Sequence, residues 1–395
     1  MSKPSLPKSI WVLGFVSMLM DISSEMIHSL LPMFMVGTLG ISVFAVGLID
    51  GIAESTTLIV KVFSGALSDR LGKRKALAVF GYGMSAFTKP LFAIAQGMGM
   101  LLTARMMDRI GKGIRGAPRD ALITDITPAE IRGAAFGLRQ SLDTIGAVVG
   151  PLLATALMLL WMNDYRRIFW LAAIPGLAAM VLLFVGVDEP DNKLADKPGN
   201  PISMHNLRRM GAAYWWVVAL GSIFTLARFS EAFLILRAQQ MQIPVAYVPL
   251  IMVAMNLVYA ATAYPFGKLS DRISHSQLLA WGLLVLVASD VVLGYSQQWY
   301  GLAAGIALWG VHMGMTQGLL SSMVAASAPA DLRGTAFGFF NLASGVSLLL
   351  ASVVAGLLWQ EFGSAFTFYA GAIFACISLL GLMLHPATKK QKVQS

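Results

Sequence analysis

Ionisable side chains that interrupt long apolar runs are the residues of this sequence best placed to do chemistry. Asp21, Glu25 and His28 occupy positions i, i+4 and i+7 of the first apolar run, so a helix would present them on one face. Such groups are costly at the depth of a bilayer and are usually functional there. Neighbouring buried carboxylates can bind and release protons near neutral pH. We therefore predict Asp21 and Glu25 as proton-coupling residues and His28 as a binding residue; the alternative is a neutral, hydrogen-bonded packing network.

A stripe of cations marks the fourth apolar run. Arg105, Arg109 and Lys112 again stand at i, i+4 and i+7. A guanidinium group suits two-point contacts with carboxylate or phosphate. Arg105 and Arg109 are therefore predicted either to bind an anionic part of a ligand or to pair with the acids of the first two runs. Arg115 and Arg119 come later in the run, where a solvated position at the membrane interface is expected.

Further polar residues within apolar runs are weaker candidates. The predicted role is proton coupling for the acids and ligand binding for the others: the acids are Glu54, Asp143 and Glu231, and the others are His312 and Gln317. For Glu54 the alternative is a buried pair with Lys61, and for Glu231 it is a local pair with Arg228. A lone histidine in a helix more often packs with a hydrogen bond than binds a ligand. Asp290 is a weaker candidate of the same kind.

The elements that hold these residues must lie in lipid. Hydrophobic residues make up 57% of the 395 residues, charged residues only 12%, and the mean hydropathy is +0.70, so a soluble globular fold is excluded. A helix needs about 20 mainly apolar residues to cross the hydrocarbon core, and the chain accommodates about twelve such helices. We predict an all-α polytopic membrane protein with spans at 10–36, 43–67, 76–96, 98–121, 133–160, 167–187, 211–236, 246–268, 277–295, 299–325, 334–359 and 364–385.

Basic residues recur between the apolar runs rather than on one soluble face. The net charge of +9 therefore indicates membrane topology and not nucleic-acid binding. With the N-terminus inside, the cytoplasmic connections hold Lys3, Lys8, the cluster 70–75, Lys268 and Arg272, whereas the opposite side holds chiefly Arg166, Arg167 and Arg237. The positive-inside rule then predicts a multi-pass protein of the inner (plasma) membrane with both termini in the cytoplasm.

A polar stretch separates two groups of six spans. Val187 to Pro201 contains Pro, Gly and several charged residues and has no helical periodicity. We predict a first six-helix bundle over 1–187, a cytoplasmic linker over 188–210 and a second six-helix bundle over 211–395.

The two groups repeat one another. Gly65-Ala66-Leu67-Ser68-Asp69-Arg70 returns as Gly267-Lys268-Leu269-Ser270-Asp271-Arg272, and Pro128 to Gly137 returns as Pro329 to Gly338. Two independent matches in one register indicate duplication of a six-helix unit. Membrane proteins built this way place a bound solute near the midplane between the halves.

Over nearly its whole length the chain resembles the major facilitator superfamily. Gly65 to Lys75 is similar, almost residue for residue, to the signature between the second and third helices of that family, and the second half holds a degenerate copy. Arg105 followed by Gly111 and Gly113 is similar to its fourth-helix motif. The resemblance implies a twelve-helix fold of two pseudo-symmetric bundles and secondary active transport by alternating access.

The same resemblance implies a conformational latch on the cytoplasmic side. Its predicted residues are Gly65, Asp69, Arg70, Gly72, Arg74, Asp271 and Arg272. Asp69 ends a helix whose last carbonyls disfavour a carboxylate, so it needs an external partner, such as the helix start near Gly334. Such a contact would exist only with the cytoplasmic side closed. The alternative is that these charges only enforce topology.

Gly146-Ala147-Val148-Val149-Gly150-Pro151 resembles the fifth-helix motif associated with proton-coupled antiporters, although Ala154 and Thr155 stand where paired glycines usually continue. Gly146 and Gly150 would allow close helix approach, and Pro151 would bend the helix, which together predict a packing hinge. The predicted function is proton-coupled efflux of a small organic solute. The alternative, motivated by the arginine stripe, is a carrier of an organic anion.

No enzymatic, metal or cofactor chemistry is predicted. The segment from Gly111 to Gly116 lacks the spacing of a phosphate-binding loop, and no nucleophile, base and orienting residue come together. Cys376 is the only cysteine, so no disulfide forms within one chain. The expected partners are the lipid bilayer, a small-molecule substrate and protons, and the expected working unit is a monomer. A non-transporting receptor is a further alternative, but the sequence offers it no sizeable soluble domain.

Overall fold

The computed structural model of the protein describes residues 6–189, 207, 209–270, 272–329 and 332–384. All regular elements within these ranges are helices. Asp271 and most of the predicted linker, residues 190–206 and 208, lie outside the described residues.

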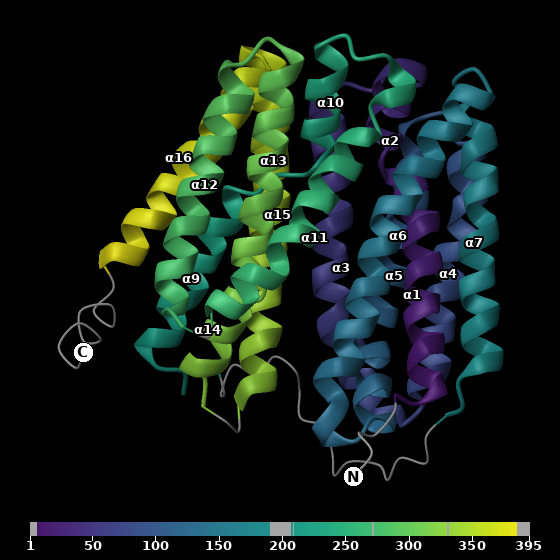
Figure 1. Cartoon of the computed structure of the whole chain (residues 1–395), viewed down its shortest axis with the longest axis vertical. Helices are drawn as coiled ribbons and strands as arrows, with labels where there is room; N and C mark the ends of the chain where they lie inside the picture. The colour runs from purple at the N-terminus through teal and green to yellow at the C-terminus, as the bar shows by residue number, and fades with distance from the viewer. Residues whose placement is uncertain (1–5, 190–206, 208, 271, 330–331, 385–395) are drawn as a thin grey trace. The chain divides into compact units, whose positions relative to one another are not determined.

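Long helices fill the first half of the chain (Figure 1). They are α1 (Lys8–His28), α2 (Leu31–Met33), α3 (Val43–Leu71), α4 (Arg74–Ile94), α5 (Met98–Ile126), α6 (Arg132–Leu160) and α7 (Tyr165–Gly186). A π-helical turn, η1 (Phe34–Thr38), follows α2, and a 3₁₀ turn, η2 (Ala129–Ile131), precedes α6.

Helices also fill the second half of the chain. They are α9 (Ala212–Leu226), α10 (Ala232–Gln240), α11 (Leu250–Ser270), α12 (His275–Tyr295), α13 (Trp299–Thr316), α14 (Leu319–Ser327), α15 (Arg333–Phe362) and α16 (Ser364–Leu384), with a 3₁₀ turn, η3 (Val245–Tyr247), before α11. Each predicted span therefore coincides with a helix or with a pair of consecutive helices.

Nine helical segments of the described residues are long and apolar enough to cross a membrane. Three predicted spans do not meet that criterion. The fourth, in α5, is long enough but carries many charges. The seventh is interrupted, so α9 has only 15 residues, and in the interrupted tenth α13 has 18 residues but is not apolar enough.

The predictions of continuous helices over 211–236 and 299–325 were wrong. Between α9 and α10, residues 227–231 leave the helix, and the hydroxyl of Ser230 accepts a bond from the backbone N–H of Ala232, which replaces a helical carbonyl. Between α13 and α14, Gly318 has a φ of +73°, a left-handed conformation that ends a helix.

The internal repeat is seen in the helix boundaries as well as in the short sequence motifs. α4 and α12 are both 21 residues long, and they begin at Arg74 and His275, an offset of 201 residues (275 minus 74). α5 and α13 begin at Met98 and Trp299 with the same offset (299 minus 98). Positions in the two halves can therefore be equated residue by residue along these helices.

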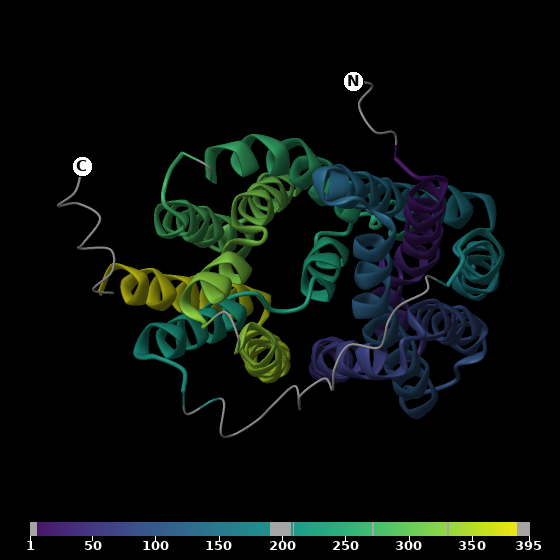
Figure 2. The same cartoon turned by 90° about the horizontal axis from the view of Figure 1, so that it is seen from below.

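The chain divides into two compact units. The first comprises residues 1–41, 52–201 and 244–253, and the second comprises residues 42–51, 202–243 and 254–395. Within the first unit, α1 packs against α6 and α7, and α4 packs against α5 and α7, around buried side chains such as Leu13, Tyr82 and Leu183. Seen along the helix axes, these helices lie side by side as a bundle (Figure 2).

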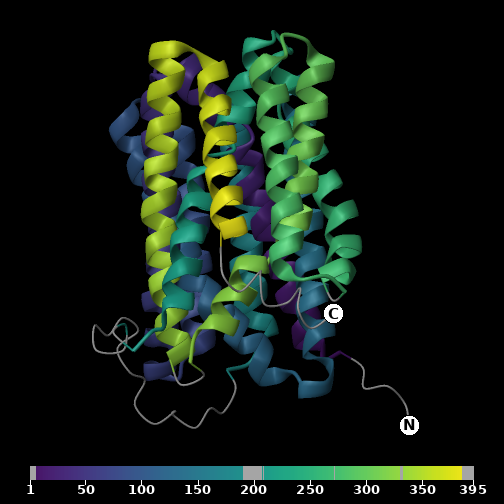
Figure 3. The same ribbon diagram turned by 90° about the vertical axis from the view of Figure 1, so that its left-hand side faces the viewer.

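Within the second unit, α12 packs against α13 and α16, and α15 packs against α9 and α16 (Figure 3). One core of this unit surrounds Tyr214, whose hydroxyl donates to the backbone oxygen of Ala336 over 3.0 Å. This bond connects the start of α9 to α15. The other end of α9 leads into the break at residues 227–231.

Candidate functional site

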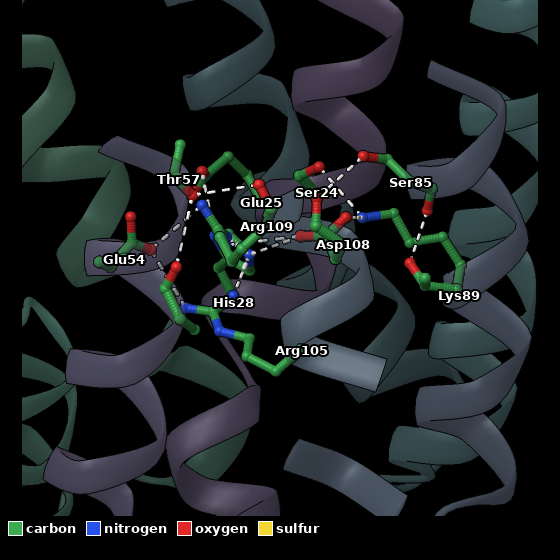
Figure 4. A network of polar contacts seen from close by, with 12 residues as sticks. Ser24, Glu25, His28, Glu54, Thr57, Ser85, Lys89, Arg105, Asp108 and Arg109 are labelled. Carbon is green, nitrogen blue, oxygen red and sulfur yellow. Dashed lines mark hydrogen bonds and ion pairs between the residues drawn. The ribbon is translucent and has the colours of Figure 1, made fainter. Parts of the chain in front are cut away.

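Polar side chains from four helices of the first unit meet in one network (Figure 4). α1 supplies Ser24, Glu25 and His28, α3 supplies Glu54 and Thr57, α4 supplies Ser85 and Lys89, and α5 supplies Arg105, Asp108 and Arg109. We call this set the buried polar cluster. It combines most of the candidates predicted on the first and fourth spans with residues that the sequence did not single out.

A lysine and an aspartate form the most enclosed part of the cluster. The Nζ of Lys89 lies 2.8 Å from the Oδ1 of Asp108, and the two side chains are 1% and 3% exposed. Lys89 also donates to the hydroxyl of Ser24 over 3.1 Å. Because two charges taken out of water are stable only when paired and hydrogen-bonded, this pair fixes α4 and α5 to α1.

One carboxylate serves two arginines. The Oε1 of Glu54 lies 3.1 Å from the Nη1 of Arg109 and 3.5 Å from the Nη2 of Arg105. The arginine side chains are 1% and 5% exposed, whereas the Glu54 side chain is 30% exposed. The pairing of these arginines with an acid of the second span is one of the two arrangements that the sequence left open.

His28 joins the remaining acids to the same arginines. Both guanidinium groups donate to its ring. Its Nδ1 lies 3.5 Å from the Oε1 of Glu25, and its Nε2 lies 3.9 Å from the Oδ2 of Asp108. The imidazole therefore sits among two cations and two acids, where a gain or loss of one proton changes the charge that all of them experience.

The cluster brings together three cations and three acids, namely Lys89, Arg105 and Arg109 with Glu25, Glu54 and Asp108. An anion from outside would have to replace one of these carboxylates, and a proton would have to neutralise one. Of these three acids, Glu54 has the most exposed side chain, at 30% against 20% for Glu25 and 3% for Asp108. Either event would therefore reach Glu54 first.

A second polar group lies further along the same helices. Arg139 donates to the Oδ2 of Asp143 over 2.8 Å within α6. The guanidinium of Arg115 stacks 4.8 Å from the ring of Tyr82 and is only 5% exposed. The expected solvated position of Arg115 was therefore wrong, because an aromatic face and the hydroxyl of Ser85 enclose it. Arg119, with 15% of its side chain exposed, is also largely enclosed.

Gly146 and Gly150 of α6 lie directly against α1. A Cβ built on Gly146 would come within 2.6 Å of the backbone oxygen of Met18 and 2.9 Å of the Cβ of Asp21. One built on Gly150 would come within 2.8 Å of the Cβ of Glu25. Pro151 follows within the same helix and is buried. The spacing of Asp21 and Glu25 from α6 thus depends on two residues without side chains.

The candidates of the second unit gather at its two helix breaks. Glu231 is the last residue of the break before α10, and Gln317 is the last before Gly318. Gln317 accepts a hydrogen bond from the hydroxyl of Tyr259, and His312, fully buried, lies 2.8 Å through its Nδ1 from the backbone oxygen of Gly282. A cavity of about 350 Å³ opens here, and it is lined by Phe224, Arg228, Met313, Thr316, Gln317, Gly318, Leu320 and Ser321.

The predicted latch residues of the first half lie at the end of α3, in the connection at Gly72 and at the start of α4. Gly72 has a φ of +62°, a conformation that glycine adopts without strain. Gly65 faces Ala117 of α5, Arg70 is exposed, and Arg74 forms an ion pair with Asp125. Glu189 accepts from the backbone N–H groups of Lys75 and Ala76 and so caps the start of α4. Of the second copy, the structure describes Arg272, which is exposed.

With this geometry in place, comparison with known proteins gives the family. The Major Facilitator Superfamily matches residues 13–237 and 220–395. This chain belongs to the major facilitator superfamily. The fold and the family that the sequence predicted are thereby confirmed, and the protein is a multi-pass membrane transporter.

Several relatives of this transporter have been described. It is 32% identical over 388 residues to an uncharacterized MFS-type transporter, MJ1317, of Methanocaldococcus jannaschii, covering 96% of this chain and 94% of the relative. It is 26% identical to multidrug resistance protein MdtH of Cronobacter sakazakii, covering 82% and 80% of the two chains. A crystal structure of a POT family transporter in complex with 5-aminolevulinic acid superposes with a TM-score of 0.81 at 14% identity, covering 96% of each chain. The last likeness concerns the fold alone.

Sequence reasoning missed Lys89 and did not select Asp108. A lysine in the middle of an apolar span is itself a signal, because such a charge needs a partner at that depth. Its partner lies on the next helix, 19 residues further along the chain. No spacing within α4 reveals it, whereas the acids and bases of α1 and α5 repeat at helical intervals.

Proposed function

We propose that this major facilitator protein is a proton-coupled exporter of small organic solutes and that Glu54 is where proton and solute binding meet. The observation that carries the proposal is the shared contact of the Glu54 carboxylate with Arg105 and Arg109. Its partly exposed position makes it reachable, while the arginines behind it stay buried.

Protonation of Glu54 would remove the charge that holds the two guanidinium groups. The free-energy cost of burying the two guanidinium groups would then change. The relative stability of the two transport conformations would change with it. We also assign proton exchange to four further acids. They are Asp21 and Glu25 of α1, Asp143 of α6, and Glu231 in the second unit. Export rather than uptake is supported by the resemblance of Gly146 to Pro151 to an antiporter motif and by the similarity to multidrug resistance protein MdtH.

A second function is favoured by the same arginines. If a carboxylate of the solute displaces Glu54, Arg105 and Arg109 offer donors for a two-point contact. The protein would then carry an organic anion, with His28, Arg105 and Arg109 in the first unit and His312 and Gln317 in the second as binding residues. The two functions differ in the charge of the solute.

Transport into proteoliposomes distinguishes the proton-coupled exporter from the organic-anion carrier. We would follow ethidium as a lipophilic cation and benzoate as an organic anion, with and without an imposed pH gradient, in wild type, Glu54→Gln and Arg109→Gln. Glu130→Gln, which removes an exposed carboxylate from η2, is the matched control.

For the exporter, wild type and the control accumulate ethidium only when a pH gradient is present, and Glu54→Gln loses this dependence. Accumulation of benzoate that disappears in Arg109→Gln, with ethidium ignored, would establish the anion carrier instead. Equal rates of ethidium movement with and without the gradient in wild type would refute proton coupling.

We also propose that the connection from Gly65 to Arg74 acts as the cytoplasmic latch, that the protein works as a monomer in the inner membrane, and that both termini are cytoplasmic. If this connection is a latch, Asp69→Asn should shift the balance of inward- and outward-open states. Alkylation of a cysteine introduced in a Cys376→Ala background measures that balance, since this substitution removes the only native thiol. If alkylation rates were unchanged in Asp69→Asn, the latch would be refuted, and these charges would serve only to set the membrane topology.

A further inference from the structure

The repeat pairs the buried lysine of the first unit with a buried acid of the second. Asp290 stands in α12 at the same offset of 201 residues from Lys89 that separates the starts of α4 and α12 (290 minus 89). Trp309 of α13 stands at the same offset from Asp108 (309 minus 108). Where the first unit has an ion pair, the second has a carboxyl group and an indole.

Neither of these two groups has a hydrogen-bond partner among the residues that the structure describes. Asp290 is fully buried, and no hydrogen bond reaches either of its carboxyl oxygens within the described residues. The Nε1–H of Trp309, also buried, makes no hydrogen bond within the same part of the chain. An ionised carboxylate without a counter-charge or a donor is the most expensive group a protein interior can hold. Asp290 in this conformation is therefore a neutral acid that carries its proton.

The surroundings of Asp290 connect it to the break in the seventh span. A Cβ built on Gly371 of α16 would lie 2.6 Å from the Oδ2 of Asp290 and 2.9 Å from the Cε1 of Phe229. The ring of Phe229 lies 5.5 Å from that of Trp309. Phe229 belongs to the non-helical residues 227–231. A movement of the break would thus change the surroundings of the indole, and Phe229 lies near the same point of α16 as the carboxyl group of Asp290.

The ionisable groups on the elements around α12 are directed elsewhere. Arg237 of α10 donates to the backbone oxygens of Leu293 and Ser296, and His312 of α13 bonds to the backbone of Gly282. Tyr369 of α16 lies beside Gly294. Arg228 and Glu231 flank Phe229 within the break, and the guanidinium of Arg228 stacks on Phe224. No ion pair to Asp290 is formed by any of them within the described part of the chain.

We propose that Asp290 is a further proton-binding site of this transporter, at the position equivalent to Lys89 and reached through the break at residues 227–231. In this conformation the carboxyl group holds its proton. When the break moves, the O–H bond of Asp290 breaks, the proton passes to water, and the carboxylate accepts a hydrogen bond from the Nε1–H of Trp309. This inference rests on the proposed proton coupling and adds to it a site buried in α12.

Infrared spectroscopy of the purified full-length protein tests the proton directly. A protonated carboxyl group has a carbonyl stretch distinct from that of a carboxylate. We expect such a band in wild type, its decrease as the pH is raised into the alkaline range, and its absence in Asp290→Asn. It should persist in Glu25→Gln and Glu54→Gln. Superimposable spectra of wild type and Asp290→Asn, or a band that no pH change alters, would overturn the proposal.

Asp290→Leu distinguishes a transport role from a structural one. Because the acid makes no hydrogen bond to the described residues, an apolar side chain of similar shape should leave the thermal unfolding midpoint unchanged or raise it. Ethidium accumulation driven by a pH gradient should be lost. A lowered midpoint together with intact accumulation would contradict the proposal. Wild type that ignores the pH gradient would instead refute the proposed function, while the infrared band would still report on Asp290.

Discussion

At the scale of single residues, the Lys89–Asp108 pair shows how the membrane interior constrains this sequence. Both side chains are almost completely buried, and each neutralises the other. Removing either partner leaves an uncompensated charge. We expect Lys89→Met and Asp108→Asn each to lower the free energy of unfolding by about 3–5 kcal/mol.

The double variant gives the informative comparison. Lys89→Met combined with Asp108→Asn removes both charges, so it should recover much of the stability that either substitution loses alone. Thermal unfolding in detergent measures all four proteins. Additive losses in the double variant would show that the two charges do not depend on each other.

At the scale of the helix, the contact of α6 with α1 decides where Glu25 lies. Gly150→Ala would place a methyl group 2.8 Å from the Cβ of Glu25 and 2.9 Å from the backbone oxygen of Ile22, so α1 must shift. We expect a loss of about 1–3 kcal/mol in stability and reduced ethidium transport. Thermal unfolding and the proteoliposome assay report the two effects.

Gly137→Ala on the same helix is the matched control. Nothing lies within 4 Å of a Cβ at this position, so the alanine should be neutral or should stabilise the helix by up to about 1 kcal/mol. If both alanines behaved alike, close packing of α6 on α1 would not limit this bundle.

The break between α13 and α14 makes a separate prediction. Gly318 has a φ of +73°, so a side chain there is strained although the space around it is open. Gly318→Ala should cost about 1–2 kcal/mol. Gly334→Ala in α15, with equally open surroundings and an ordinary helical backbone, should not. Equal unfolding midpoints for the two variants would mean that the break tolerates a different conformation.

The helices were predictable from the sequence, and their interruptions were not. Apolar runs of membrane-spanning length fix where helices such as α12 and α16 begin and end to within a few residues. The break in the seventh span, at Arg228 to Ser230, contains neither glycine nor proline, the residues that usually end a helix. Their departure from the helix depends on neighbours in α13 and α16, which no local pattern records. The same reason explains why Glu54 was a candidate from sequence while its joint contact with Arg105 and Arg109 needed the fold.

At the scale of the whole molecule, the distribution of basic residues should decide how the chain lies in the membrane. Lys73, Arg74 and Lys75 follow α3. At the equivalent place in the second half, Lys268 lies in the last turn of α11 and Arg272 follows that helix. The connection between α6 and α7 is short and holds Asp164 before the arginines that begin α7. Because basic connections are retained in the cytoplasm, the two basic connections should lie inside and the connection at Asp164 outside.

Reporter fusions test this orientation. Green fluorescent protein joined after residue 395 should fluoresce, and alkaline phosphatase joined there should be inactive. In a chain truncated and fused at Asn163, the activities should be reversed, because an odd number of predicted spans precedes that position. Replacing Lys73, Arg74 and Lys75 together by glutamine should make the topology mixed, since the strongest cytoplasmic signal of the first half is lost. Active phosphatase at the C-terminus of the unaltered chain would show that the charge distribution does not set the orientation.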